Sequence, residues 1–204
     1  AKLPYDPLRD FAPVTLVLVT PYLATVQAAL PANNLREFIA LAKAKPGALN
    51  YASSGQGGPQ HLAGELFQRE AGVQMLHVPY KGSGPAMTDL IGGQVLTMIE
   101  TAPAALPFIR SGKLRALAAA SAQRIPNLTE VPTATEAGLP GFEVSSMFGL
   151  IAPAGTPRAV IMRLNAEVVR ILQVPEVKEK MLQQGVVATP TTPEQAAQRI
   201  HDEV

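Results

Sequence analysis

Apolar and polar positions along the chain repeat with two different periods. The β-branched run PVTLVLVT at residues 13–20 predicts a buried strand. Apolar residues three and four positions apart then predict a helix over NNLREFIALAKAKPG, with Asn34 as its N-cap and Glu37 three residues later. The residues expected on its inward face are Leu35, Phe38, Ile39 and Ala42.

Strand-like and helix-like runs continue to alternate as far as residue 121. Strands are predicted up to Tyr51 and over VQMLHVPY, QVLTMIE and LRALAAAS. Helices are predicted after the glycine-rich SSGQGGP, over GPAMTDLIGG and over TAPAALPFIRSG. In the last of these, Pro107 is expected to shorten or kink the helix. The residues expected to face inward from the helix after the glycine-rich loop are Leu62, Ala63, Leu66 and Phe67. This rhythm predicts an α/β fold, with a mostly parallel sheet covered by helices on both faces.

A proline-rich connector, QRIPNLTEVPTATEAGLPGFE, leads into a second region. There the sequence predicts a strand over SSMFGLIAP and helices over RAVIMRLNAEVVRIL and PEVKEKMLQQG. A last helix is predicted over TTPEQAAQRIHDEV, with a capping box formed by Thr192 and Gln195. The chain is expected to cross between two lobes near residues 22–26 and 145–148.

Composition narrows the possible functions. Of the 204 residues, 47% are apolar and 16% charged, which is typical of a globular protein. The net charge of +1 and the 5% aromatic content without Trp do not favour nucleic-acid binding. The absence of Cys excludes disulfides and thiol chemistry, and three scattered histidines predict no metal site, so no cofactor is expected. His77 is expected within a strand and His201 on the surface.

Three strand-to-helix turns in succession are rich in small residues. The first is Ser53, Ser54, Gly55, Gln56, Gly57 and Gly58, followed by His61 on the helix; the second is Tyr80, Lys81, Gly82, Ser83 and Gly84; the third is Glu100, Thr101 and Ala102. Ligands of open α/β sheets collect at such turns, where helix N-termini present free N–H groups. With serine hydroxyls and one lysine nearby, the pattern predicts a site for an anion, and a carboxylate suits it.

Other interpretations of the first turn remain open. A phosphate-binding GxxxxGK[ST] loop, the GxGxxG fingerprint and the GxSxG elbow all fail to match. A plain tight turn, or catalysis by Ser54 with His61, would also fit the residues. His61 is expected either to contact the ligand or to close the first turn of its helix. Lys81 is either solvated or in the site. Glu100 is either a specificity residue that meets a hydroxyl, an amine or a water, or a helix cap.

Six collinear motifs resemble one family. They are KLPYDPLRDFAPVTLV, YASSGQGGPQHLAGELF, HVPYKGSGPAMTDLIGGQV, SGKLRALAAAS, VPTATEAGLPGFE and FGLIAPAGTPRAVIMRLNAEV. The chain is similar throughout to the substrate-binding proteins of tripartite tricarboxylate transporters, the Bug family. The resemblance implies a two-lobed periplasmic type II binding-protein fold. Such a protein captures a small carboxylate in its interlobe cleft, delivers it to the membrane subunits of a transporter, performs no catalysis and is expected to be monomeric.

The resemblance also implies roles for individual positions. The residues that match the ligand-binding motifs are Ser53 to Gly58, His61, Tyr80, Lys81, Gly82, Ser83, Glu100 in place of the usual aspartate, Thr101, and Phe148 in a hinge region. Residues 1–23 and 147–204 are expected to form part of lobe 1, and residues 24–146 to form lobe 2. The family's opening strand and glycine loop, a signal peptide and the end of the last helix are not recognised, which indicates a fragment. The alternatives from other classes are the effector-sensing domain of a transcription regulator and a serine-type hydrolase.

Overall fold

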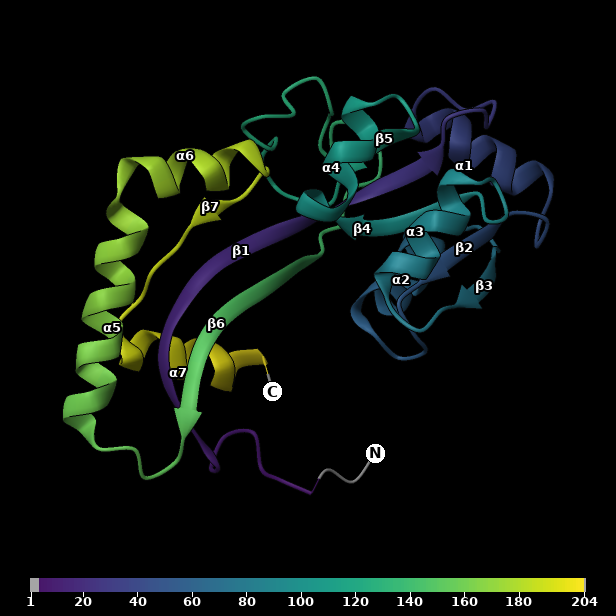
Figure 1. Ribbon diagram of the computed structural model, residues 1–204. Coiled ribbons are helices and arrows are strands. Elements are labelled where there is room, and N and C mark those ends of the chain that lie inside the picture. The colour runs from purple at the N-terminus through teal and green to yellow at the C-terminus, as the bar shows by residue number, and fades with distance from the viewer. Residues whose placement is uncertain (1–3, 204) are drawn as a thin grey trace. The chain divides into compact units, whose positions relative to one another are not determined.

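The computed structural model describes residues 4–203, and its internal contacts divide the chain into two compact units (Figure 1). Unit 2 comprises Thr20–Ser146, and unit 1 comprises the residues up to Val19 and those from Met147 onward. Strands β1 (Phe11–Gln27) and β6 (Ser145–Pro153) contribute residues to both units. β1 is longer than the run predicted at residues 13–20, because it continues through Pro21 into a second apolar stretch.

The sheet of unit 2 is mixed. Its strands are β2 (Asn50–Ser53), β3 (Leu76–Pro79), β4 (Thr97–Thr101), β5 (Leu114–Ala119) and the second part of β1. They lie in the order β3-β2-β4-β1-β5. The expected parallel pairing holds for β2 with β3 and with β4, whereas β1 lies antiparallel between β4 and β5. The parallel strands are therefore confined to the part of the sheet that carries the three predicted turns.

Four helices of unit 2 occur where the sequence predicts them. They are α1 (Leu35–Ala44), α2 (Pro59–Ala71), α3 (Ser83–Ile91) and α4 (Ala102–Arg110). The N-cap of α1 is confirmed, because the Asn34 side chain accepts a hydrogen bond from the Glu37 N–H at 2.9 Å. Pro107 lies inside α4 and does not shorten it.

The inward face of α2 is predicted in part: Ala63 and Phe67 are buried as expected and Leu66 packs half-buried against the core, but the prediction for Leu62 is wrong. Leu62 was expected to face inward, but it is 61% exposed. The buried residues of α2 are Gln60, Ala63, Gly64, Phe67 and Ala71, which recur at the three- and four-residue spacing of one helical face. A polar residue and a glycine thus occupy inward positions, while Leu62 lies outside that face.

Unit 1 is built on the first part of β1. Strands β6 and β7 (Val187–Ala188) both pair with β1, and the helices are α5 (Arg158–Gln173), α6 (Pro175–Gln183) and α7 (Pro193–Glu203). The predicted capping box of α7 is confirmed: Thr192 Oγ1 accepts from the Gln195 N–H at 3.2 Å, and Gln195 Oε1 accepts from the Thr192 N–H at 3.0 Å.

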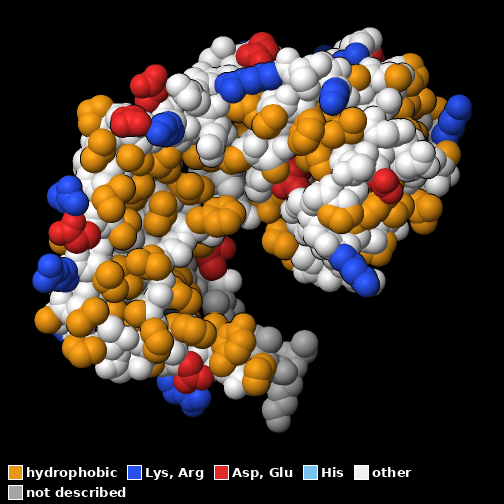
Figure 2. Space-filling view, in the orientation of Figure 1, with side chains coloured by type: hydrophobic (Ala, Val, Ile, Leu, Met, Phe, Trp, Pro, Cys, Tyr) orange, Lys and Arg blue, Asp and Glu red, His pale blue; other side chains and the backbone are white. Residues whose placement is uncertain are grey.

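Large apolar side chains lie exposed on unit 1, and Figure 2 shows hydrophobic side chains gathered over α5 and β6. Those at least 38% exposed on these two elements are Phe148, Leu150, Ile151, Val160, Met162, Leu164 and Ile171. Such a surface is larger than the scattered apolar residues that soluble proteins normally expose. None of the helices in the described part of the chain has the length and apolar character needed to cross a membrane.

Candidate functional site

Three helices of unit 2 begin at one edge of the sheet (Figure 1). Because β2, β3 and β4 are parallel, their carboxyl ends meet at that edge, and α2, α3 and α4 follow them within a few residues. Their N-caps are Gly58, Gly82 and Thr101, and none of them makes a side-chain capping hydrogen bond. Apart from Pro59 and Pro103, which have no N–H, the first two residues of these helices can therefore offer N–H groups to an acceptor from outside, as an anion site requires.

Gln60 joins the three turns, although the sequence analysis did not select it. Its Oε1 accepts a hydrogen bond from Ser54 Oγ at 2.6 Å. Its Nε2 donates to Ser83 Oγ at 3.2 Å and to the two carboxylate oxygens of Glu100 at 3.4 and 3.5 Å. One buried amide thus contacts a residue from each turn. The sequence offered only a polar residue in the first turn of α2, and the inward face predicted for this helix did not include Gln60.

Glu100 lies beneath the third turn with 1% of its surface exposed. Its Oε1 accepts from the Thr101 N–H at 2.7 Å and from Thr101 Oγ1 at 3.0 Å. The sequence left two roles open for Glu100, a specificity residue or a helix cap. In the structure its carboxylate bonds to Thr101 at the start of α4, as a helix cap does, and it also contacts Gln60.

Hydrogen bonds of the Ser53 side chain hold the glycine-rich turn in place. This residue is fully buried, and its Oγ accepts from the Gly55 N–H at 3.2 Å and bonds to His77 Nε2 at 2.7 Å. Gly57 has a φ of +77°, a conformation that favours glycine. The second turn is tied to the first, because the Gly82 N–H donates to the Ser54 carbonyl at 2.9 Å. The structure therefore places the Ser53 side chain inside the unit, whereas Ser54 lies at the partly exposed surface of the turn.

His61 closes the first turn of α2. Its Nδ1 accepts from the Gly57 N–H at 3.0 Å, and its ring stacks on His77 with centroids 4.0 Å apart. Ser54 donates its hydroxyl hydrogen to Gln60, so the structure shows no Ser54–His61 pair of the kind a serine hydrolase needs. The Ser53–His77 contact does not supply that chemistry either, because the Ser53 hydroxyl is out of reach of a substrate.

The stacked histidines predict a loss of stability in mild acid. Burial, and then the neighbouring His61, lower the pKa of His77 below its usual value. The folded state thus binds fewer protons than the unfolded state as the pH falls below about 6.5, the usual histidine pKa. Stability should be fully present above that pH and decrease below it. Urea unfolding at pH 7.5 and 5.5 measures this, and a His77→Phe variant should show a smaller difference between the two. An equal difference in the variant would contradict the assignment to His77.

The remaining predicted site residues are distributed as follows. In the second turn, the Tyr80 hydroxyl donates to Asp89 Oδ2 at 2.8 Å, and Lys81 is exposed. Thr101 is half-buried at the N-cap of α4. Gln56 is exposed at the surface of the glycine-rich turn. Phe148 belongs to unit 1, where 52% of its surface is exposed.

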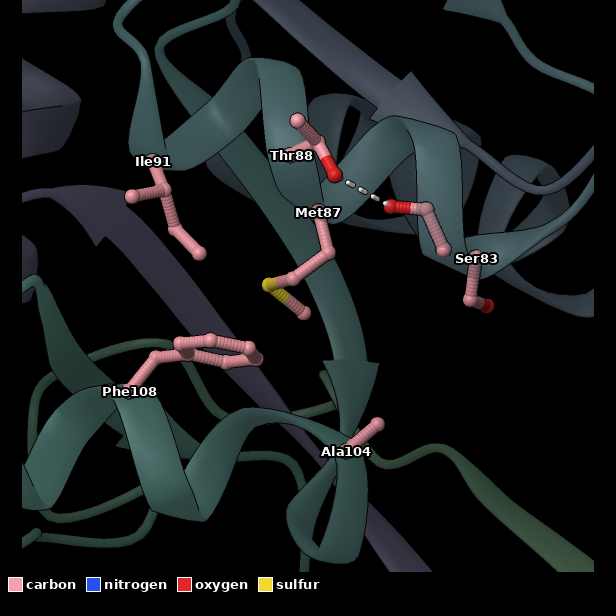
Figure 3. A pocket seen from close by; sticks show the side chains of 7 residues that line it. Ser83, Met87, Thr88, Ile91, Ala104 and Phe108 are labelled. Atoms are coloured by element: carbon pink, nitrogen blue, oxygen red, sulfur yellow. Dashed lines mark hydrogen bonds between the residues drawn. The ribbon is translucent and has the colours of Figure 1, made fainter.

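An apolar cavity of about 330 Å³ lies between α3 and α4 (Figure 3). Its lining residues are Ser83, Gly84, Met87, Thr88, Ile91, Ala104 and Phe108. Figure 3 shows Met87, Ile91 and Phe108 directed towards the space between the two helices. Ser83 in the second turn therefore has two kinds of neighbour: its hydroxyl bonds to Gln60, and it also lines the apolar cavity.

This arrangement of strands, turns and helices is the α/β fold of periplasmic binding proteins, and the predicted fold class is confirmed. The chain belongs to the tripartite tricarboxylate transporter family receptors, whose family model matches residues 1–204. The resemblance drawn from the six motifs is thereby confirmed as well.

Among curated proteins, the chain is 41% identical over 203 residues to the protein BugT of Bordetella pertussis, covering 100% of this chain and 62% of BugT. It is 42% identical over 194 residues to the UPF0065 protein in the tcbD-tcbE intergenic region of Pseudomonas sp. strain P51, covering 95% of this chain and 58% of the relative. The chain thus spans about three fifths of the length of these relatives.

Two solved structures from Rhodopseudomonas palustris are similar and carry acids. Rpa4515 with adipate has a TM-score of 0.95 at 36% identity, over 99% of this chain and 68% of that one. MatC with bound malate has a TM-score of 0.88 at 36% identity, over 100% of this chain and 70% of that one. The periplasmic binding protein BugD has a TM-score of 0.91 at 34% identity, over 98% of this chain and 68% of that one.

Proposed function

We propose that this chain is part of an extracytoplasmic, periplasmic solute receptor that binds a small carboxylate and delivers it to the membrane subunits of a tripartite tricarboxylate-type transporter. The observation that carries the proposal is the convergence of three uncapped helix N-termini, which Gln60 joins into one surface. Family membership and the adipate and malate held by two similar proteins support it. The protein binds its ligand as a monomer and performs no chemistry on it.

The ligand's carboxylate accepts hydrogen bonds from the first N–H groups of α2, α3 and α4. These groups carry the positive ends of the helix dipoles, and the exposed Lys81 adds a positive charge at the second turn. Further contacts are expected from residues at the partly exposed surface of the turns, such as Ser54 and Ser83, whereas the buried Ser53 hydroxyl is out of reach. The cavity between α3 and α4 adjoins Ser83, so an apolar part of the acid can lie against Met87 and Phe108.

A thermal-shift screen of mono-, di- and tricarboxylates on the protein expressed from its complete gene tests the proposal. A ligand that binds only the folded state stabilises it by about 2.7 kcal/mol when its concentration is about 100 times its dissociation constant. We therefore expect at least one acid to raise the melting temperature by several degrees, and the corresponding amide to have no effect. A complete set of acids without any shift would rule out the receptor.

Unit 1 is proposed to be the incomplete lobe 1, and unit 2 to be lobe 2. The apolar surface on α5 and β6 supports this, because the curated relatives have more chain than the region matched here and a missing part of the lobe would cover such a surface. The same screen, run on the 204-residue chain and on the complete gene product, compares the thermal shifts that an acid causes in each protein. The acid should raise the melting temperature of the complete product by more; equal shifts would contradict the proposal.

A further inference from the structure

We propose that Glu100 and Gln60 fix the direction of the hydroxyl hydrogens in the site, so that it selects a carboxylate that also carries a hydrogen-bond donor, either a hydroxyl or an ammonium group. Neither residue needs to touch the ligand for this, and both act as positioning residues. The inference rests on the proposed function and specifies its ligand class.

The first step is the orientation of the Gln60 side chain. Glu100 is a carboxylate that accepts hydrogen bonds from Thr101 and lies within 3.5 Å of Gln60 Nε2. Both carboxyl oxygens of Glu100 accept from Gln60 Nε2, so the amide presents its NH₂ group to Glu100 and its oxygen to the opposite side. Gln60 is 7% exposed, so water does not offer the amide an alternative set of partners.

The second step carries this orientation to two serines. The Gln60 oxygen faces Ser54, so the Ser54 hydroxyl must donate its one hydrogen to it, and does so at 2.6 Å. The Gln60 NH₂ group faces Ser83, so Ser83 Oγ must accept, and does so at 3.2 Å. The hydrogen of Ser54 is therefore used inside the protein, whereas the hydrogen of Ser83 remains for another acceptor.

The third step concerns what the site offers a ligand. The hydroxyl hydrogen of Thr101 is also used inside the protein, because its Oγ1 donates to Glu100. Ser54, Ser83 and Thr101 are all half-buried. The site thus presents one hydroxyl donor, Ser83, and two hydroxyl oxygens, those of Ser54 and Thr101, that can only accept. A carboxylate suits Ser83 and the helix N–H groups, while a hydroxyl or ammonium group of the same ligand suits Ser54 and Thr101.

The test measures selectivity by isothermal titration calorimetry on the protein expressed from its complete gene. Pairs of acids of equal length are compared: succinate with malate and aspartate, glutarate with 2-hydroxyglutarate and glutamate, and propionate with lactate and alanine. We expect the substituted acid of the best-binding set to bind about tenfold more tightly than the plain acid, which is the typical effect of one hydrogen bond. In Glu100→Gln the Gln60 amide is free to exchange the positions of its oxygen and its NH₂ group. The ratio of the two affinities, substituted acid to plain acid, should then fall close to one.

Two further variants keep the proposal testable if Glu100→Gln does not fold. Ser54→Ala should weaken binding of the substituted acid about tenfold more than binding of the plain acid, whereas Ser83→Ala should weaken both by the same factor. Glu130→Gln, at an exposed position in the connector, is the matched control and should keep the wild-type ratio.

The outcomes separate the inference from the proposed function. Equal binding of plain and substituted acids by the wild type, or an unchanged ratio in both Glu100→Gln and Ser54→Ala, would overturn the polarity argument while leaving the receptor in place. Failure of every acid to bind would overturn the proposed function, and the inference with it.

Discussion

A Gly64→Ala variant is expected to lose about 2 kcal/mol of folding free energy, although alanine is the better helix former. Gly64 lies on the buried face of α2, and a Cβ atom there would come within 2.2 Å of Cε2 in the Tyr51 ring. The ring has no room to move away. It is fully buried, it stacks on His77 with centroids 4.9 Å apart, and its hydroxyl donates to Glu65 Oε1 at 2.6 Å.

The effect should reach the glycine-rich turn as well as stability. A displaced Tyr51 ring pushes on His77, which supports both the buried Ser53 hydroxyl and the stacked ring of His61. Urea unfolding measures the loss of stability, and a reduced thermal shift with the best-binding acid would show the effect on the site. Gly84→Ala is the control for stability, because a Cβ atom there meets nothing within 4 Å. A Gly64→Ala protein as stable as the wild type would contradict the described packing of α2 on β2.

The close contact between Gly64 and Tyr51 also explains where the prediction from sequence failed. The sequence located α2 correctly, because its proline, its glycines and its apolar spacing are local signals. It did not give the rotation of the helix about its axis. That rotation is set by Gly64 fitting against a tyrosine from β2, and it turns Gln60 inward and leaves Leu62 exposed. A contact between two elements has no signature within either of them.

The same distinction applies to the site. The three turns were predicted, because small residues between a strand and a helix mark a place where backbone N–H groups are accessible. The direction in which the Ser53 side chain points was not predicted. Tyr51, Ala52 and Ser53 are all buried, and a strand covered on both faces shows no alternation of polar and apolar residues. The antiparallel placement of β1 depends on pairing with β4 and β5, which lie more than 70 residues further along the chain.

The substitution Gln60→Met is expected to weaken the binding of every acid by at least tenfold. Methionine has nearly the shape of glutamine, so the packing of α2 is largely kept, but it can replace none of the amide's hydrogen bonds to Ser54, Ser83 and Glu100. Each of the three turns then keeps its own helix N-terminus and loses its connection to the other two. A site whose donors are no longer held together must order them when the ligand binds, which lowers the affinity.

Calorimetric titration of Gln60→Met with the best-binding acid measures this loss, and urea unfolding of the same variant shows how much stability changes. Gln74→Met is the matched control, because Gln74 is exposed in the loop after α2 and lies outside the three turns. The expected pattern is a large loss of affinity with a small loss of stability. If Gln60→Met lost stability and bound the acid as the wild type does, Gln60 would serve only the packing of α2. The three N-termini would then act separately, because nothing else in the site touches one residue from each turn among the hydrogen bonds of the described residues.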